Sequence, residues 1–422
     1  MNLAFATRAL RSRNYKLFFT GQGISLIGTW MTRIATSWLV YRLTGSAALL
    51  GVVGFAGQIP AFVLGPVAGV WVDRWDRHRT IVITQILSTV QSFALAVLAL
   101  AHIVTVWEIV GLAFLQGLIN AFDMPARQSF VIEMVERRED LGNAIALNSS
   151  MVNAARLIGP AIAGVLVASV GEGYCFLIDG ISYIAVIVSL LMMRLATAPP
   201  KKAARRVWHE LVDGWQYVVH SVPIRSILLN LSVISLFGMP YSVLMPIFAA
   251  KVLGGGANTL GLLMAATGVG ALVGAMMLAV RKNVVGLGRR IVVTTGMFGV
   301  ALIGFALSRW LWLSLLLLPI AGFGMMQQMA ASNTILQTIV DDEKRGRVMA
   351  FYSMAFQGMA PFGSLLAGSL AARFGAPVTV TVSGVACALG SVWFASRLPQ
   401  IRQIVRPIYV RLGIVEQVPD LS

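Results

Sequence analysis

Runs of about twenty mostly apolar residues recur along the whole of this 422-residue chain. A helix rises about 1.5 Å per residue, so each run is long enough to cross a bilayer core of about 30 Å. Soluble domains carry roughly 25% charged residues, whereas here 57% of the residues are hydrophobic and 12% are charged. The chain is therefore predicted to be an all-α integral membrane protein with twelve transmembrane helices. The predicted spans cover residues 17–41, 47–72, 80–101, 105–122, 142–168, 174–195, 222–248, 259–280, 291–308, 310–332, 347–372 and 377–397.

The positions of the basic residues explain the formal net charge of +16. Nucleic-acid binding would place them on one basic face, but they concentrate in alternate loops between the predicted spans. The opposite loops contain only Arg42, Lys251, Arg309 and Arg373. Because basic loops remain on the cytoplasmic side, we expect both termini in the cytoplasm. We also expect membrane lipids as partners of the basic loops and no nucleic-acid partner.

Residue types that carry enzyme chemistry are sparse. The two cysteines, Cys175 and Cys387, lie at or within predicted spans, and the four histidines have no metal-ligand spacing. No catalytic Ser/His/Asp set and no phosphate-binding glycine loop stands out. We therefore expect no enzyme activity, no metal and no cofactor, and we interpret the cysteines as small apolar core residues.

An internal repeat relates the two halves of the chain. A shift of about 204 residues superposes Gly164 on Gly368 and Gly171 on Gly375. Transporters often contain repeats of this size, with the substrate site between the halves near the middle of the membrane. The repeat predicts two pseudo-symmetric six-helix bundles. The predicted parts are a bundle at 1–195, a cytoplasmic linker at 196–221 with an amphipathic helix over 208–219, a bundle at 222–397 and a cytoplasmic tail at 398–422.

The loop after the second predicted span is densely charged and reads Gly-Val-Trp-Val-Asp-Arg-Trp-Asp-Arg-His-Arg from residue 69 to residue 79. This pattern resembles the signature loop of the major facilitator superfamily, in which the loop stabilises the outward-facing state. The resemblance implies the fold of that superfamily and a gating role for this loop. The implied gating residues are Gly69, Asp73, Arg74, Arg77 and Arg79, together with Asp123 of the fourth span.

Each signature residue has a physical role that we can predict. Gly69 permits close helix approach, Asp73 caps a helix end, and Arg77 pairs with a carboxylate, for which Asp123 is the proposed partner. Asn120 and Asp123 belong to one polar stripe of the fourth span. The alternative is that these charges are simply solvated.

The fifth predicted span contains Gly159, Pro160 and Gly164, which resemble the antiporter motif of proton-coupled exporters in the same superfamily. Proline removes one helix hydrogen bond and glycine permits tight packing, so this helix could bend between the halves. An ordinary kink is the alternative. The chain departs from the exporter pattern at Ala113, where these exporters often carry an arginine linked to proton coupling.

Three charged residues lie more than one helical turn inside predicted spans: Arg33, Arg156 and Asp179. A charge inside the membrane is costly, so each should face a cavity or a partner. Either arginine is a candidate to bind an anionic substrate group, and a structural Arg156–Asp179 pair is the alternative. Asp179 and Asp123 are the candidate proton carriers.

The predicted cavity lining of the second half is neutral. Tyr241 lies on the seventh span, and Gln327 and Gln328 lie on the tenth, where methionines add adaptable apolar surface. Together with Arg33, Arg156 and Asn120, these residues form the predicted substrate site. Such a lining suits a small, partly apolar and anionic solute.

Two further patterns resemble one branch of the superfamily, which contains enterobactin exporters and macrolide or drug efflux proteins. They are Gly-Thr-Trp-Met at 28–31 and Asp-Met-Pro-Ala-Arg at 123–127. The branch implies a monomeric bacterial inner-membrane exporter of a siderophore or drug-like molecule, coupled to proton antiport. The alternatives are uptake, transport of a lipid-like substrate, or a membrane scaffold or sensor that does not transport.

Overall fold

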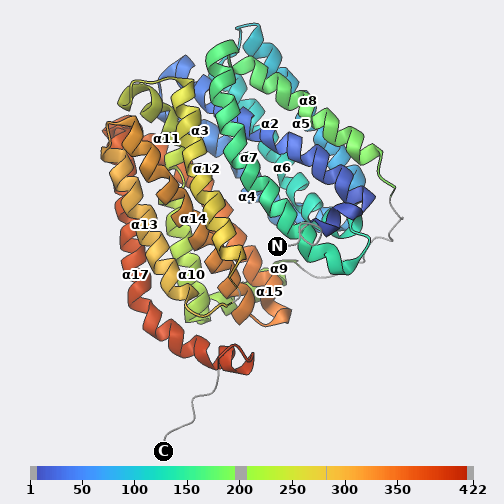
Figure 1. Cartoon of the computed structure of the whole chain (residues 1–422), viewed down its shortest axis with the longest axis vertical. Coiled ribbons are helices and arrows are strands. Elements are labelled where there is room, and N and C mark those ends of the chain that lie inside the picture. Colours follow the sequence, from blue (N-terminus) through green and yellow to red (C-terminus); the bar gives the residue numbers. More distant parts are fainter. Residues whose placement is uncertain (1–6, 195–206, 282, 416–422) are drawn as a thin grey trace, which may run out of the picture. The chain divides into compact units, whose positions relative to one another are not determined.

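The computed structural model describes residues 7–194, 207–281 and 283–415. All regular structure in these ranges is helical (Figure 1), which confirms the predicted all-α membrane fold. Ten helical runs within the described ranges are long and apolar enough to span a membrane, and each overlaps one predicted span. The other two predicted spans are also helical, but polar side chains lower the hydropathy of the first and a bend at Met359 interrupts the eleventh. The count of twelve stays a prediction.

Local sequence explains where several helices of the first half begin. Ser46 accepts a hydrogen bond from the Leu49 amide, and Asp76 accepts one from the Arg79 amide. Thr105 and Glu108 form a capping box that satisfies otherwise unpaired amides at a helix start. The elements are η1 (Arg8–Arg11), α2 (Arg13–Thr44), α3 (Ala47–Ala56), α4 (Ile59–Arg74), α5 (Arg77–Leu100), α6 (Val106–Met134), η2 (Arg138–Asp140), α7 (Leu141–Val170) and α8 (Glu172–Leu191).

The described part of the second half contains three π-helical segments that interrupt longer helical runs. Two of these segments, η3 and η5, contact each other, and the Ser235 hydroxyl of η3 donates to the Phe356 carbonyl of η5. The elements are α9 (Val207–His220), α10 (Val222–Val233), η3 (Ile234–Gly238), α11 (Tyr241–Ile247), η4 (Phe248–Val252), α12 (Ala257–Ala279), α13 (Leu287–Leu307), α14 (Leu311–Ile339), α15 (Asp342–Ser353), η5 (Met354–Gly358), α16 (Ala360–Phe374) and α17 (Ala376–Arg411).

Glycines related by the repeat end corresponding helices in the same way. Gly171 follows α7 with φ of +91°, and Gly375 follows α16 with φ of +85°. Glycine adopts this left-handed region without the steric cost that other residues meet. In both copies the next residue starts another helix, which agrees with the predicted duplication.

The chain folds into two compact units. Unit 1 comprises residues 1–204, 243–268 and 364–373, and unit 2 comprises residues 205–242, 269–363 and 374–422. Unit 1 therefore includes pieces of α12 and α16 from the second half of the sequence. The predicted bundle boundaries stay predictions, and the predicted linker falls partly on residues 195–206, outside the described residues.

Unit 1 contains two close contacts between a helix of the first half and a helix of the second. A Cβ added at Gly164 of α7 would lie 2.9 Å from the Cα of Gly261 in α12. A Cβ added at Gly368 of α16 would lie 2.8 Å from the Cα of Gly51 in α3. Gly164 and Gly368 correspond in the repeat, so the duplicated glycine makes the same kind of backbone contact twice.

Candidate substrate and proton site

The signature loop has a different pairing from the predicted one. The Arg77 guanidinium lies 2.5 Å from a carboxylate oxygen of Glu133 near the end of α6. Asp123 lies ten residues earlier on that helix, about 15 Å further along its axis, so the start of α5 does not reach it. The prediction of an Arg77–Asp123 pair is wrong for this structure, and the missed partner is Glu133.

The other loop residues also differ in part from their predicted roles. Asp76, rather than Asp73, caps α5, and the side chain of Asp73 lies outside what the structure describes. A Cβ at Gly69 would meet no atom within 4 Å, so this glycine makes no close helix contact here. Arg74 and Arg79 are exposed, and Arg79 lies 4.0 Å from Asp76. The gating role of the loop stays a prediction.

Asp123 is the centre of a buried hydrogen-bond network between α5 and α6. Its carboxylate accepts bonds from the Thr84 hydroxyl at 2.6 Å and the Gln85 amide at 3.0 Å. The Arg127 guanidinium, one helical turn further along α6, lies 2.5 Å from the other oxygen of the same carboxylate. Asp123 is only 5% exposed, so these partners compensate the loss of water around a buried charge.

Asp179 is a second buried carboxyl group, on α8, and it has a different environment. Its carboxylate accepts bonds from Thr32 of α2 at 2.8 Å and Ser92 of α5 at 3.2 Å. The Ser182 hydroxyl lies 3.5 Å from its other oxygen. Among the described residues Asp179 forms no ion pair, so the alternative Arg156–Asp179 pair is not formed here.

A polar stripe along α5 connects the surroundings of the two carboxyl groups. Thr84, Ser88 and Ser92 follow one another at four-residue spacing, each at most 5% exposed, and therefore lie on one face of the helix. Thr84 bonds Asp123, Ser92 bonds Asp179, and Ser88 accepts a bond from Gln116 of α6 at 3.3 Å. Sequence reasoning missed this stripe, although its spacing was readable.

Arg33 and Arg156, the two arginines inside predicted spans, both lie against the side chain of Trp30. The guanidinium carbons of Arg33 and Arg156 lie 5.0 Å and 5.2 Å from the ring centroid of Trp30. These distances are within the range of cation–π attraction. Arg33 is exposed and Arg156 is partly exposed, although both belong to predicted membrane helices. Two positive groups in one accessible place favour an anion between or beside them.

The antiporter-like motif accounts for this arrangement. A Cβ at Gly159 would lie 2.5 Å from the Cβ of Trp30, so only glycine allows α7 to approach α2 this closely. Arg156 precedes Gly159 by three residues and is on the same side of α7. Gly159 therefore brings Arg156 to the indole, while Pro160 and Gly164 contact Gly261 of α12 further along.

The remaining predicted substrate residues have mixed positions. Asn120 of α6 is partly exposed and accepts a bond from Gln116 at 3.2 Å. Gln327 and Gln328 of α14 are fully buried within unit 2, where the Gln327 amide donates to the Gly274 carbonyl at 2.6 Å. Tyr241 is also buried and meets Phe298 edge to face, with ring centroids 6.2 Å apart. The binding roles of these residues stay predictions, because Gln327, Gln328 and Tyr241 are buried and a solute does not reach them in this conformation.

The membrane helices and the internal repeat define the class of fold, a helical integral membrane protein with a duplicated architecture. Solved transporters share the fold. A transporter of the POT family, solved in complex with 5-aminolevulinic acid, superposes with a TM-score of 0.74 over 92% of this chain and 97% of its own, at 11% identity.

Sequence comparison then gives the family. The profile described as transmembrane secretion effector matches residues 4–407, and the chain belongs to this family of the major facilitator superfamily. The Staphyloferrin A transporter of Staphylococcus aureus is 28% identical over 88% of this chain and 92% of its own length. The multidrug efflux pump Tap of Mycolicibacterium fortuitum is 29% identical over 89% of this chain and 93% of its own length. These relatives confirm the predicted superfamily and its efflux branch.

Proposed function

We propose that this chain is a secondary-active exporter of a small, partly apolar and anionic molecule, driven by proton antiport. The observation that carries the proposal is the cluster of Arg33 and Arg156 on the indole of Trp30. The guanidinium groups would bind a carboxylate or a similar anion, and the indole would contact an apolar part of the same solute. An anion would also reduce the repulsion between two nearby positive charges.

The relatives support the type of substrate and the direction of transport. One is named as the Staphyloferrin A transporter and another as a multidrug efflux pump. We infer a siderophore or drug-like solute, moved out of the cytoplasm of a bacterium across its inner membrane by a monomer with both termini inside. Alternating access would require the glycine contacts of unit 1 to form and separate in each cycle.

The buried carboxyl groups support proton coupling. Asp179 is surrounded by hydroxyl donors, so taking up a proton removes a buried charge that has no counter-ion among the described residues. Asp123, in contrast, has the Arg127 guanidinium 2.5 Å from its carboxylate. We infer that Asp179 carries the proton. We also infer that the polar stripe of α5, through Ser92 and Ser88, leads from Asp179 toward Asp123 and the side of the membrane on which Asp123 lies.

Transport into inverted membrane vesicles with an acidic interior tests this proposal. Staphyloferrin A and a macrolide serve as probes, and an exporter coupled to protons accumulates at least one of them only while the gradient lasts. Arg33→Gln and Arg156→Gln should each reduce accumulation about tenfold, since a hydrogen bond to a charged group contributes about 1.5–3 kcal/mol. Lys16→Gln, an exposed change on the same helix, is the matched control.

The alternatives give different results in the same vesicles. Accumulation without a gradient, or only with the gradient reversed, would indicate uptake or facilitated movement. Full transport by both arginine variants would refute the anion site. No flux of either probe, combined with binding of both, would favour a scaffold or sensor.

A further inference from the structure

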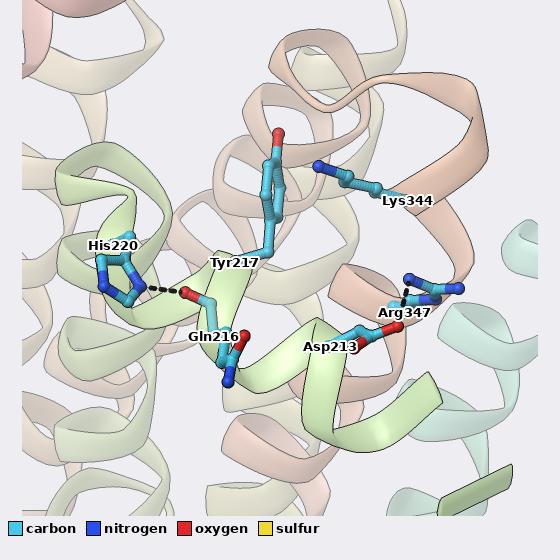
Figure 2. Close-up of a pocket in the computed structure, with 6 residues that line it drawn as sticks. All are labelled: Asp213, Gln216, Tyr217, His220, Lys344 and Arg347. Atoms are coloured by element: carbon cyan, nitrogen blue, oxygen red, sulfur yellow. Dashed lines mark hydrogen bonds and ion pairs between the residues drawn. The ribbon is translucent and has the colours of Figure 1, made fainter. Parts of the chain in front are cut away.

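The face of α9 that meets α15 contains a polar pocket within unit 2, separate from the embedded charges of unit 1. The pocket has a volume of about 400 Å³ and six lining residues (Figure 2). Four of them come from one face of α9 and two from the first turns of α15. The lining residues are Asp213, Gln216, Tyr217, His220, Lys344 and Arg347.

The pocket is held in place by packing of α9 against its neighbours. A Cβ at Gly214 would lie 3.1 Å from the Cβ of Arg347 and 3.1 Å from the ring of Phe351. Val218, on the same helix, is only 5% exposed and belongs to the apolar core of unit 2. The predicted amphipathic segment is therefore helical, and one side of it is fixed against the protein.

Two of the lining residues are positively charged and one, Asp213, is negatively charged, while the nearby Asp341 carboxylate has Arg411 at 3.4 Å. The Lys344 ammonium lies 4.4 Å from the centroid of the Tyr217 ring and forms no ion pair among the described residues. Arg347 lies 3.6 Å from a carboxylate oxygen of Asp213, which is longer than a charge-assisted hydrogen bond. The Asp213 side chain is 54% exposed, so water also screens this pair.

The other lining groups add hydrogen-bonding capacity. Burial and the nearby carboxylate of Asp341 raise the pKa of Tyr217, so its phenol keeps the proton and can donate. His220 contacts the Gln216 carbonyl at 2.7 Å through Nδ1, and Figure 2 draws its other ring nitrogen on the side of the ring away from the remaining lining residues. The Gln216 amide is exposed at the same rim.

We propose that Lys344 and Arg347, with Tyr217, form a binding site for a phosphate group between α9 and α15. A lysine ammonium and an arginine fork are the groups that proteins use for phosphate. The group could come from an anionic phospholipid or from a soluble phosphate ester. Trp215 is 58% exposed beside the pocket, and exposed tryptophan is typical of the headgroup region of a bilayer.

Native mass spectrometry of the full chain tests the site with three probes: short-chain phosphatidylglycerol, short-chain phosphatidylcholine and glycerol 3-phosphate. The double variant Lys344→Gln/Arg347→Gln should bind phosphatidylglycerol at least about tenfold more weakly, because each lost charged contact contributes a factor of that order. Arg402→Gln/Arg406→Gln removes two exposed charges outside the pocket and should bind like the wild type.

The outcomes separate the two sources and can overturn the site. Binding of glycerol 3-phosphate with the same dependence on Lys344 and Arg347 would identify a soluble ester, whereas selective binding of phosphatidylglycerol would identify the lipid. Equal weakening in both double variants, or no difference between the two lipids, would overturn the proposal. If the Lys344→Gln/Arg347→Gln variant does not fold, the binding of phosphatidylglycerol to Asp213→Asn tests the site instead. This variant frees Arg347 and should bind several-fold more tightly, and unchanged affinity would overturn the site. None of these results depends on export.

Discussion

Replacing Gly164 by alanine should push α7 and α12 apart. The added Cβ would lie 2.9 Å from the Cα of Gly261 and 3.1 Å from the carbonyl oxygen of Ala257. Both are backbone atoms, so no side chain can move aside and the helices must separate by several tenths of an ångström. Overpacking of this kind costs about 1–3 kcal/mol, which lowers the population of the closed contact about 5- to 150-fold.

Gly142→Ala is the matched control for this change. It lies in the first turn of the same helix, a Cβ there meets no atom within 4 Å, and alanine has a higher helix propensity than glycine. The difference between the two variants therefore isolates the helix contact.

Thermal melting and hydrogen–deuterium exchange measure the effect of Gly164→Ala. The variant should melt lower than the Gly142→Ala control and exchange faster at the start of α12, around residues 257–261. Equal melting and equal exchange in the two variants would refute the claim that Gly164 holds these helices together.

Three further predictions concern charged side chains. Arg77→Gln and Glu133→Gln should each destabilise the protein, with a coupling of about 0.5–2 kcal/mol in a double-mutant cycle of unfolding; additive losses would show that the pair does not interact. Asp179→Asn preserves the hydroxyl contacts but cannot carry a proton, so solute exchange should persist in proteoliposomes while dependence on the pH gradient is lost. Retained dependence would place the proton elsewhere. Arg42→Gln leaves the buried Glu172 carboxylate without its two guanidinium bonds of 2.8 Å and 3.1 Å. This change should lower stability by about 1–3 kcal/mol, and an unchanged melting temperature would contradict it.

The fold and the family were predictable because their signals lie along single segments of chain. An apolar run is long enough to span a membrane wherever it occurs, and the described helices overlap every predicted span. Repeat-related glycines also coincide in structure, as Gly171 and Gly375 show. The signature loop and the antiporter-like motif were specific enough to indicate the superfamily that sequence comparison confirms.

Partners across helices were not predictable in the same way. Arg77 pairs with Glu133 rather than Asp123 because the register of α5 against α6 decides which carboxylate is within reach. The convergence of Arg33 and Arg156 required Gly159 to contact Trp30, a fact that belongs to the crossing of α2 and α7.

The sequence by itself therefore determined what each helix is and which of its faces is polar. Hydrophobic length and periodicity are properties of one segment, so they can be read without knowing the neighbours. The tertiary structure decided which polar faces meet, for example that α5 brings Ser92 to Asp179 while Thr84 bonds Asp123. Those contacts depend on helix register and closeness of approach, which small residues at the crossing points set together.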